Sequence, residues 1–410
     1  MEMLSNQSTD FSITHRIPAS IIMALGLTAA ALGQADEPAK PLVATTPRVP
    51  AFGIELPDHA RTQLRAHTDA LGQPIDALAR QHADTPPLLH HLPDVQVYHK
   101  AVDWALNHRI FFKPSELKTA EELLVAGSER AAQLASGKTP WTRATGLVVR
   151  GYVSRLDDSV QPYGLVIPQS VSTDPWRKRR LDVWLHGRDN KLSELKFIQQ
   201  RRTSAGQFTP PDTIVLHPYG RFCNAFKFAG EVDVLEALAH AKKQYPVDNN
   251  RVSIRGFSMG GGGCWHLGAH LAGDWVAVAP GAGFAESLEY LGLARKNAMP
   301  PAHEQALWGL YDATKYAGNL FNTATVAYSG EIDKQKQAAD IMARHLADEG
   351  LALHHVIGPD TGHKYHPAAK AEINERISAA AAKGPLAKSA GDGADDACNI
   401  RTQGTYCALS

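Results

Sequence analysis

The chain has 410 residues, 44% of them hydrophobic, and its lysines plus arginines equal its aspartates plus glutamates at 42 each. This length and apolar content are ample for a large core and favour more than one folding unit. The balanced charge, without a basic stripe interleaved with aromatic residues, excludes a nucleic-acid partner from our expectations.

The first 35 residues are typical of an export signal. His15 and Arg16 precede an apolar run at 21–33 that is too short to span a bilayer. Gly33 and Ala35 are small residues at suitable cleavage positions. An N-terminal buried helix or an uncleaved anchor is the alternative. We therefore expect an exported protein, periplasmic or extracellular, with no membrane span after the signal is removed.

Four cysteines fit an oxidising compartment, because an even number permits disulfides. Cys398 and Cys407 flank a short loop and are expected to pair. Cys223 and Cys264 either form a second disulfide near the proposed site or remain buried thiols, and the sequence leaves both possibilities open. No C-x-x-C pattern occurs, so a cysteine zinc site is not expected.

The N-terminal third continues with a linker and a helical segment. Residues 36–54 carry four prolines and are expected to form an extended linker. Residues 55–140 place apolar side chains near helical spacing, which predicts helices over 58–81, 95–107 and 115–135. This helical segment holds no obvious chemistry.

From residue 141 short apolar strands alternate with helices. Strands are predicted at 144–154, 163–167, 181–185, 213–216, 251–255, 275–279, 323–328 and 353–357, and helices at 193–202, 231–244, 258–271, 334–348 and 367–382. This alternation predicts a mostly parallel eight-stranded sheet with helices on both faces over residues 141–382. Residues 383–410 are expected to be a flexible tail that contains the Cys398–Cys407 loop.

The most informative stretch is GFSMGGGG at 256–263, which contains a G-x-S-x-G pattern around Ser258. A strand-like run comes before it and a helix-compatible run follows. This context predicts a tight strand-to-helix turn that lifts the Ser258 hydroxyl clear of the sheet and aims the Met259 N–H at the same space. A glycine-rich loop with an incidental serine is the alternative.

A nucleophilic serine needs a base, and the base needs an orienting acid. His363 follows the last predicted strand in a Gly/Pro loop and is the expected base, with His366 as the runner-up. Asp333 follows the preceding strand and is the expected acid. Glu331 is its main rival and Asp360 a weaker one. The competing role for Asp333 is a helix N-cap.

An acyl-transfer site also needs two N–H donors for the oxyanion of the tetrahedral intermediate. Met259 is expected to supply one. The second is expected from the amide of Arg188 or Gly187, in the HGR run at 186–188 that follows the strand at 181–185. An ordinary glycine turn is the alternative for this loop.

Two further features of the sequence have both a functional and a structural interpretation. His266 and His270 are four residues apart, but their HLGAH run lacks the glutamate of a zinc protease, so packing is expected and no metal or cofactor is predicted. The segment 281–322 is expected to form a cap. Its aromatic residues either line a pocket or form the cap's own core; they are Phe284, Tyr290, Trp308, Tyr311, Tyr316 and Phe321.

The run PVDNNRVSIRGFSMGG at 246–261 resembles the α/β-hydrolase superfamily, in particular its prolyl oligopeptidase-like and polyhydroxybutyrate-depolymerase-like esterase branches. The resemblance covers roughly residues 145–380. It implies the α/β-hydrolase fold, here with an N-terminal helical segment. It also implies Ser258 as nucleophile, His363 as base and Asp333 as orienting acid.

One departure from this resemblance concerns the substrate. Prolyl oligopeptidases carry a large β-propeller before the hydrolase domain, where this chain has about 85 residues of helical pattern at 55–140. We therefore expect a serine hydrolase that cleaves small-molecule carboxylic esters through an acyl-enzyme. A serine peptidase of prolyl oligopeptidase-like type acting on short peptides is one alternative, and a catalytically silent hydrolase fold used for binding is another. The acyl and alcohol groups and the oligomeric state are left open.

Overall fold

The computed structural model describes residues 50–81 and 86–385. The predicted export signal, most of the predicted linker, and the tail with Cys398 and Cys407 lie outside the described residues, so these interpretations stay predictions. Within the described ranges, no helix combines the length and the apolar character that crossing a membrane requires.

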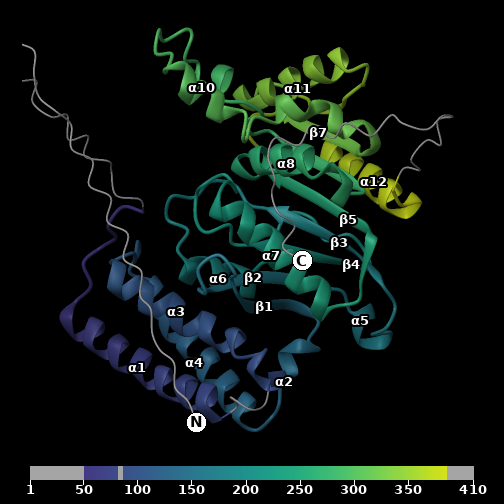
Figure 1. The fold of residues 1–410 in the computed structure, drawn as a ribbon. Helices are drawn as coiled ribbons and strands as arrows, with labels where there is room; N and C mark the ends of the chain where they lie inside the picture. The colour runs from purple at the N-terminus through teal and green to yellow at the C-terminus, as the bar shows by residue number, and fades with distance from the viewer. Residues whose placement is uncertain (1–49, 82–85, 386–410) are drawn as a thin grey trace, which may run out of the picture. The chain divides into compact units, whose positions relative to one another are not determined.

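The centre of the fold is one eight-stranded sheet with the order β1-β2-β4-β3-β5-β6-β7-β8. The antiparallel pairs are β1 with β2 and β2 with β4, and all other neighbours are parallel (Figure 1). This mostly parallel order confirms the predicted α/β-hydrolase fold. The strands are β1 Gly146–Val153, β2 Val160–Ile167, β3 Arg179–Leu185, β4 Thr213–Pro218, β5 Val247–Phe257, β6 Ala277–Gly281, β7 Ala324–Gly330 and β8 His354–Gly358.

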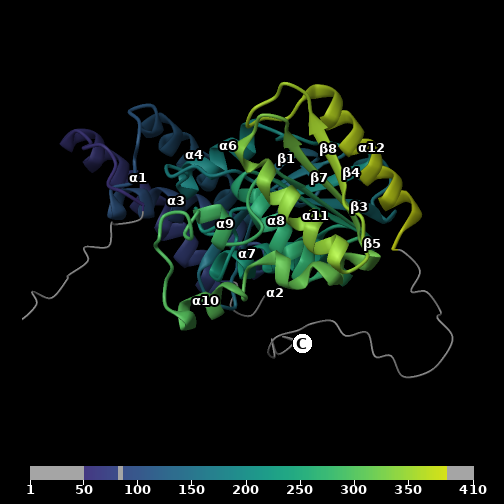
Figure 2. The same ribbon diagram turned by 90° about the horizontal axis from the view of Figure 1, so that it is seen from above.

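Helices cover both faces of this sheet, as the alternation of strands and helices predicted. One face packs against α7, α8 and α11, and α12 covers β5 to β8 on the other face (Figure 2). The helices of this part are α5 Ser170–Thr173, α6 Glu194–Thr203, α7 Ala229–Gln244, α8 Met259–His270, α9 Leu288–Leu291, α10 Ala302–Trp308, α11 Gln337–Asp348 and α12 Pro367–Lys383. The described residues also form 3₁₀ turns, η1 Pro140–Thr142, η2 Ala272–Asp274, η3 Ala313–Asn322 and η4 Lys334–Lys336.

The helical segment before the sheet consists of α1 Asp58–Gln81, α2 Pro86–Leu89, α3 Pro93–His108 and α4 Glu116–Ala135. Its helices α3 and α4 pack against β1, β2 and α6 through shared apolar side chains. A buried ion pair joins it to the sheet, because Asp94 Oδ1 accepts hydrogen bonds from Arg150 Nε and from the Gly151 N–H, both at 2.8 Å. Asp94 Oδ2 accepts the indole N–H of Trp141 at 2.9 Å.

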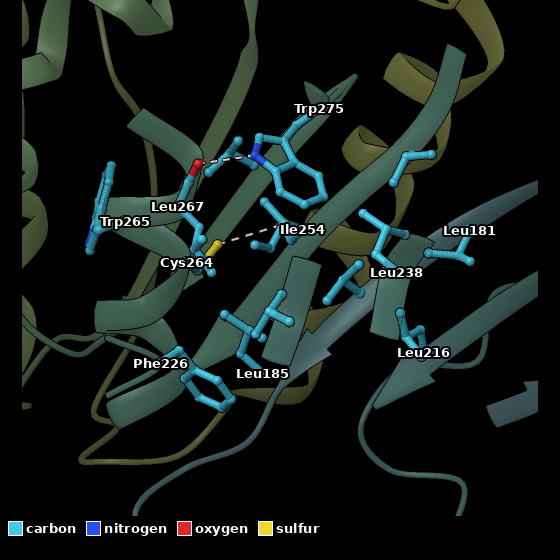
Figure 3. Close-up of a cluster of buried hydrophobic side chains, with 14 of the residues drawn as sticks. Leu181, Leu185, Leu216, Phe226, Leu238, Ile254, Cys264, Trp265, Leu267 and Trp275 are labelled. Atoms are coloured by element: carbon cyan, nitrogen blue, oxygen red, sulfur yellow. Dashed lines mark hydrogen bonds between the residues drawn. The ribbon is translucent and has the colours of Figure 1, made fainter. Parts of the chain in front are cut away.

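The largest core cluster lies under α8 and contains fully buried side chains from α8 and the central strands (Figure 3). Two strand boundaries near it differ from the predicted ones. β5 begins at Val247 instead of residue 251, because a bulge between Arg179 and Leu181 lets Val247 pair with Arg179. β6 begins at Ala277, whereas Trp275 packs into the core and donates its indole N–H to Leu267 O at 3.0 Å.

Candidate active site

The carboxyl ends of the parallel strands meet at one edge of the sheet. Leu185 of β3 pairs with Gly256 of β5, and Phe257 pairs with Gly281 of β6. Further along, Gly330 of β7 pairs with Gly358 of β8. The loops after β3, β5, β7 and β8, which hold the predicted site residues, therefore leave the sheet at the same edge, where ligands bind in open α/β sheets.

Ser258 occupies the sharp turn between β5 and α8 that the sequence predicted. Its φ is 59° and its ψ is −119°, a conformation that non-glycine residues rarely adopt. The turn demands glycine at two flanking positions: an added Cβ at Gly256 would lie 2.1 Å from Gly260 O, and one at Gly260 would lie 2.0 Å from Leu185 O. The Ser258 N–H donates to Gly281 O at 2.9 Å, which ties the turn to β6.

His363 and Asp333 come together although 30 residues separate them. The His363 Nδ1 lies 2.8 Å from Asp333 Oδ2, and because a carboxylate only accepts, the imidazole is the donor. Asp333 Oδ1 accepts the N–H of Gln335 at 2.9 Å and caps η4. Each carboxylate oxygen of Asp333 thus has its own partner, the His363 ring for Oδ2 and the Gln335 N–H for Oδ1. Asp333 is 3% exposed and His363 is 41% exposed, so the acid is buried behind a histidine that faces outward.

The alternatives to Asp333 and His363 are engaged elsewhere. Glu331 is exposed, and its Oε2 accepts the N–H of Asp360 at 2.9 Å. Asp360 is itself exposed. His366 precedes α12, and its backbone N–H donates to Tyr328 Oη at 2.8 Å. Among the described residues, neither Glu331 nor Asp360 forms a hydrogen bond or ion pair with a histidine.

Aromatic packing holds the His363 ring beside the turn. Its centroid lies 4.8 Å from that of Phe257, the residue before Ser258, and Phe257 lies 4.8 Å from Tyr365. In the part of the chain that the structure describes, no hydrogen bond joins Ser258 to His363. Sequence reasoning missed the role of Phe257, since the second position of G-x-S-x-G is not restricted by the pattern.

The predicted oxyanion loop lies next to Ser258. An added Cβ at Gly187 would be 3.7 Å from Ser258 Cβ, so the backbone there passes within contact distance of the turn. Met259 begins α8 and is buried, whereas the Arg188 side chain is exposed. The ring nitrogens of His186 lie 2.9 Å from the carbonyl oxygens of Gly187 and Tyr219, which fixes the loop to the segment after β4.

That segment, 219–228, supports the predicted oxyanion loop, and sequence reasoning missed it. Cys223 Sγ donates to Asp189 O at 2.9 Å, and the Phe226 ring packs on His186 with centroids 5.0 Å apart. The segment is unusually strained, because several of its non-glycine residues have positive φ: Arg221, Phe222, Ala225, Phe226 and Phe228. Such clusters of strain occur at functional sites. In the sequence of this segment, Gly220 and Asn224 are the residue types that favour a turn.

The structure contradicts a Cys223–Cys264 disulfide. Both are free thiols, and they serve different places: Cys223 is half-buried against the oxyanion loop, and Cys264 is fully buried. Cys264 Sγ donates to Ile254 O at 3.5 Å inside the core (Figure 3). Burial raises the pKa of both thiols, so neither is an activated thiolate.

The aromatic residues of 281–322 have different surroundings. Tyr316 packs into the main core, with its ring centroid 4.0 Å from that of His270. The ring of Phe284 lies at a tilt beside that of Tyr290, with centroids 4.6 Å apart. Phe321 is 49% exposed. The pocket-lining role stays a prediction.

His266 and His270 lie under this segment with ring centroids 6.0 Å apart. Burial lowers the pKa of His266 to about 3 and that of His270 to about 4, so both rings are neutral at pH 7. Within residues 50–81 and 86–385, no three His, Cys, Asp or Glu side chains gather in a way that could hold a metal ion.

The chain matches no family model and no curated protein. Among solved structures it is similar to one described as a dipeptidyl aminopeptidase IV from Bacteroides ovatus, at 13% identity over 59% of this chain and 36% of that one, with a TM-score of 0.44. The chain therefore spans about a third of that protein.

Two other similar structures are of shorter proteins. A ferulic acid esterase shares 19% identity over 57% of this chain and 97% of that one, with a TM-score of 0.42. The fluorophosphonate-binding serine hydrolase F of Staphylococcus aureus shares 16% identity over 58% of this chain and 99% of that one, with a TM-score of 0.44.

Proposed function

We propose that this protein is a serine hydrolase that cleaves carboxylic esters, with Ser258 as nucleophile, His363 as general base and Asp333 as its orienting acid. The observation that carries the proposal is the hydrogen bond from His363 Nδ1 to Asp333 Oδ2, made at the sheet edge where Ser258 occupies a strained turn. This bond leaves His363 Nε2 as the nitrogen free to accept a proton. A serine–histidine hydrogen bond commonly tightens only in the substrate complex.

The chemistry follows from these roles. His363 Nε2 takes the proton of Ser258 Oγ while Oγ attacks the ester carbonyl carbon. The carbonyl oxygen becomes an oxyanion that accepts the N–H of Met259 and that of Arg188 or Gly187. The tetrahedral intermediate collapses, the C–O bond to the alcohol breaks, and His363 returns the proton to the alcohol. Water activated by His363 then hydrolyses the acyl-enzyme by the same steps, and no cofactor takes part.

The choice of esters over peptides rests on the leaving group. The amine leaving group of a peptide must be protonated as it departs. This requires a site that binds the peptide backbone and positions the amine beside the general acid. The segment before the hydrolase fold packs as a helical layer against β1, β2 and α6, where prolyl oligopeptidases carry a β-propeller. Comparing kcat/KM for p-nitrophenyl esters with that for proline p-nitroanilides tests this choice. Because the activated ester is intrinsically easier to cleave, an anilide value that rivals the ester value would establish the peptidase alternative.

A fluorophosphonate probe separates the enzyme from a silent hydrolase fold, because only an activated serine is labelled. We expect covalent labelling at Ser258, found by peptide mass spectrometry, and loss of labelling in Ser258→Ala. Replacing Ser253 by alanine provides the matched control, since this serine lies on β5, the strand that leads into Ser258, but is fully buried in the sheet. Labelling that persists in Ser258→Ala would overturn the assignment.

We also propose that the protein is exported. The support is the short apolar run at 21–33 with small residues after it, and the even number of cysteines.

A further inference from the structure

One cation near the candidate site has no acceptor. Lys227 is half-buried in the segment after β4, and no described residue accepts a hydrogen bond from its ammonium or forms an ion pair with it. The ammonium lies over two ring faces instead, 5.5 Å from the centroid of Phe284 and 5.2 Å from that of Tyr311. Such contacts stabilise a cation modestly, but they supply no acceptor for its three N–H groups.

The acidic residues near Lys227 form hydrogen bonds with other side chains. Asp312 accepts the hydroxyl of Ser287 at 2.8 Å, and Glu231 is hydrogen-bonded to Tyr311. Burial lowers the pKa of Lys227, with Asp312 opposing the shift from a distance. The ammonium therefore has no acceptor among the described side chains, and an anionic group of a ligand would supply one.

Two rings connect the surroundings of Lys227 to the candidate site. Phe284 lies against the first turn of α8, because an added Cβ at Gly262 would be 2.6–2.9 Å from its ring carbons. The N–H of Gly262 donates to Ser258 O at 3.1 Å. Phe226, which precedes Lys227 in the chain, packs on His186 of the loop after β3. Lys227 is thus surrounded by rings that pack against the start of α8 and against the loop after β3.

The two histidines of α8 near Lys227 add no second positive charge. His266 and His270 are neutral at pH 7 because burial lowers their pKa and the Lys227 charge lowers it further. Among the described side chains around Phe284 and Tyr311, Lys227 is therefore the cation that an anionic group would meet, beside two ring faces.

We propose that Lys227 binds a carboxylate carried by the substrate, so that the preferred substrates are esters with a second, free carboxylate, such as half-esters of dicarboxylic acids. This inference rests on the proposed function. It makes Lys227 a specificity-determining residue that touches the substrate away from the reacting carbonyl. Its effect therefore falls on binding more than on the chemical step.

The test compares two esters of equal chain length, p-nitrophenyl hydrogen glutarate and p-nitrophenyl pentanoate. We expect Lys227→Met to lower kcat/KM for the glutarate half-ester about 10- to 100-fold, mainly through KM, because a charge-assisted hydrogen bond is lost. The pentanoate value should change by less than about twofold, since the neutral ester makes no such bond. Lys227→Arg should restore most of the half-ester activity. Lys315→Met, at an exposed lysine of the segment 281–322, is the control and should affect neither ester.

A binding readout makes the result independent of turnover. Glutarate should slow fluorophosphonate labelling of Ser258 in the wild type and lose this effect in Lys227→Met, with equal thermal midpoints showing that the variant is folded. Equal losses for both esters in Lys227→Met, or no glutarate protection in an active wild type, would overturn the inference and leave the esterase proposal standing. Failure of the wild type to cleave either ester or to be labelled would overturn both.

Discussion

Glu331 Oε2 accepts the backbone N–H of Asp360 at 2.9 Å, which ties the loop after β7 to the loop after β8. Asp360 adopts a φ of 47°, so this bond holds a left-handed turn three residues before His363. The rival acid thus positions the histidine loop from outside, whereas Asp333 bonds the imidazole itself.

Because Asp333 and Glu331 have these different partners, replacing each carboxylate by its amide should have different effects on activity. Asp333→Asn should lower kcat by on the order of 10⁴-fold, because the amide favours the wrong imidazole tautomer and cannot stabilise the imidazolium. Glu331→Gln should cost less than about tenfold, since the exposed amide oxygen still accepts the Asp360 N–H. Steady-state kinetics on one ester decides, and a larger loss in Glu331→Gln would show that the acid was misassigned.

Ser258→Ala should lower kcat by on the order of 10⁴-fold or more, because the members of such a triad act as a unit. The fold should persist, since Ser258 contributes its backbone to the turn and removal of Oγ breaks no hydrogen bond among the described residues. Hydrolysis and thermal unfolding are measured on the same preparation. More than about a tenth of the wild-type rate would be incompatible with a Ser258 nucleophile.

Asp94→Asn should destabilise the protein by about 3–5 kcal/mol, because it leaves the Arg150 guanidinium buried without its counter-ion. Both side chains are fully buried, and although burial alone would raise the Asp94 pKa, Arg150 holds that pKa well below its usual range. The shift in urea midpoint measures the effect. Asp76→Asn on α1 is the exposed control and should be nearly neutral. Equal midpoints for the two variants would show that the ion pair contributes nothing.

We expect acid to destabilise the protein at a pH well above the usual pKa of carboxylates, which is about 4. Burial lowers the pKa of six described histidines, and four of them shift most: His240 to about 4, His266 to about 3, His270 to about 4, and His217 well below its usual value; His186 and His355 shift in the same direction. Their folded-state pKa values are depressed, so their stabilising effect is complete above the unfolded pKa of about 6.5 and is lost as pH falls below it. Asp233 acts in the opposite sense, because burial raises its pKa to about 6.

Near pH 5.5, unfolding should therefore take up about three protons, and the free energy of unfolding should fall by about 4 kcal/mol per pH unit. Urea midpoints measured between pH 5 and 7 give this slope. His266→Leu should lower the slope by about one proton, whereas His303→Gln, at an exposed histidine, should leave it unchanged. An identical slope in His266→Leu and the wild type would contradict the neutral state of the buried ring.

Exported protein should begin near Asp36 and contain a Cys398–Cys407 disulfide together with two free thiols at Cys223 and Cys264. We expect Cys223 and Cys264 to remain free thiols because they lie in different environments of the fold. Mass spectrometry of non-reduced material with thiol alkylation tests the prediction. An intact Met1 or four free thiols would indicate that the protein stays in a reducing compartment.

The local features of this protein could be predicted from its sequence because short-range sterics and periodicity decide them. Gly256 and Gly260 around Ser258 indicate the strand-to-helix turn, because a side chain at either position would clash with backbone atoms. The alternation of strands and helices predicted the doubly covered sheet, and the chain order of Ser258, Asp333 and His363 predicted which loops share its edge.

Choices between neighbouring candidates were decided only by tertiary structure. Asp333 and Glu331 are two residues apart and chemically alike, but loop packing buries one against His363 and turns the other outward. The separation of Cys223 from Cys264, and the strained segment 219–228 that brings Lys227 to the site, likewise depend on contacts between residues distant in sequence. The spacing of residues along the chain determines the local backbone conformation. The partner of a side chain depends instead on which distant residues the fold places against it.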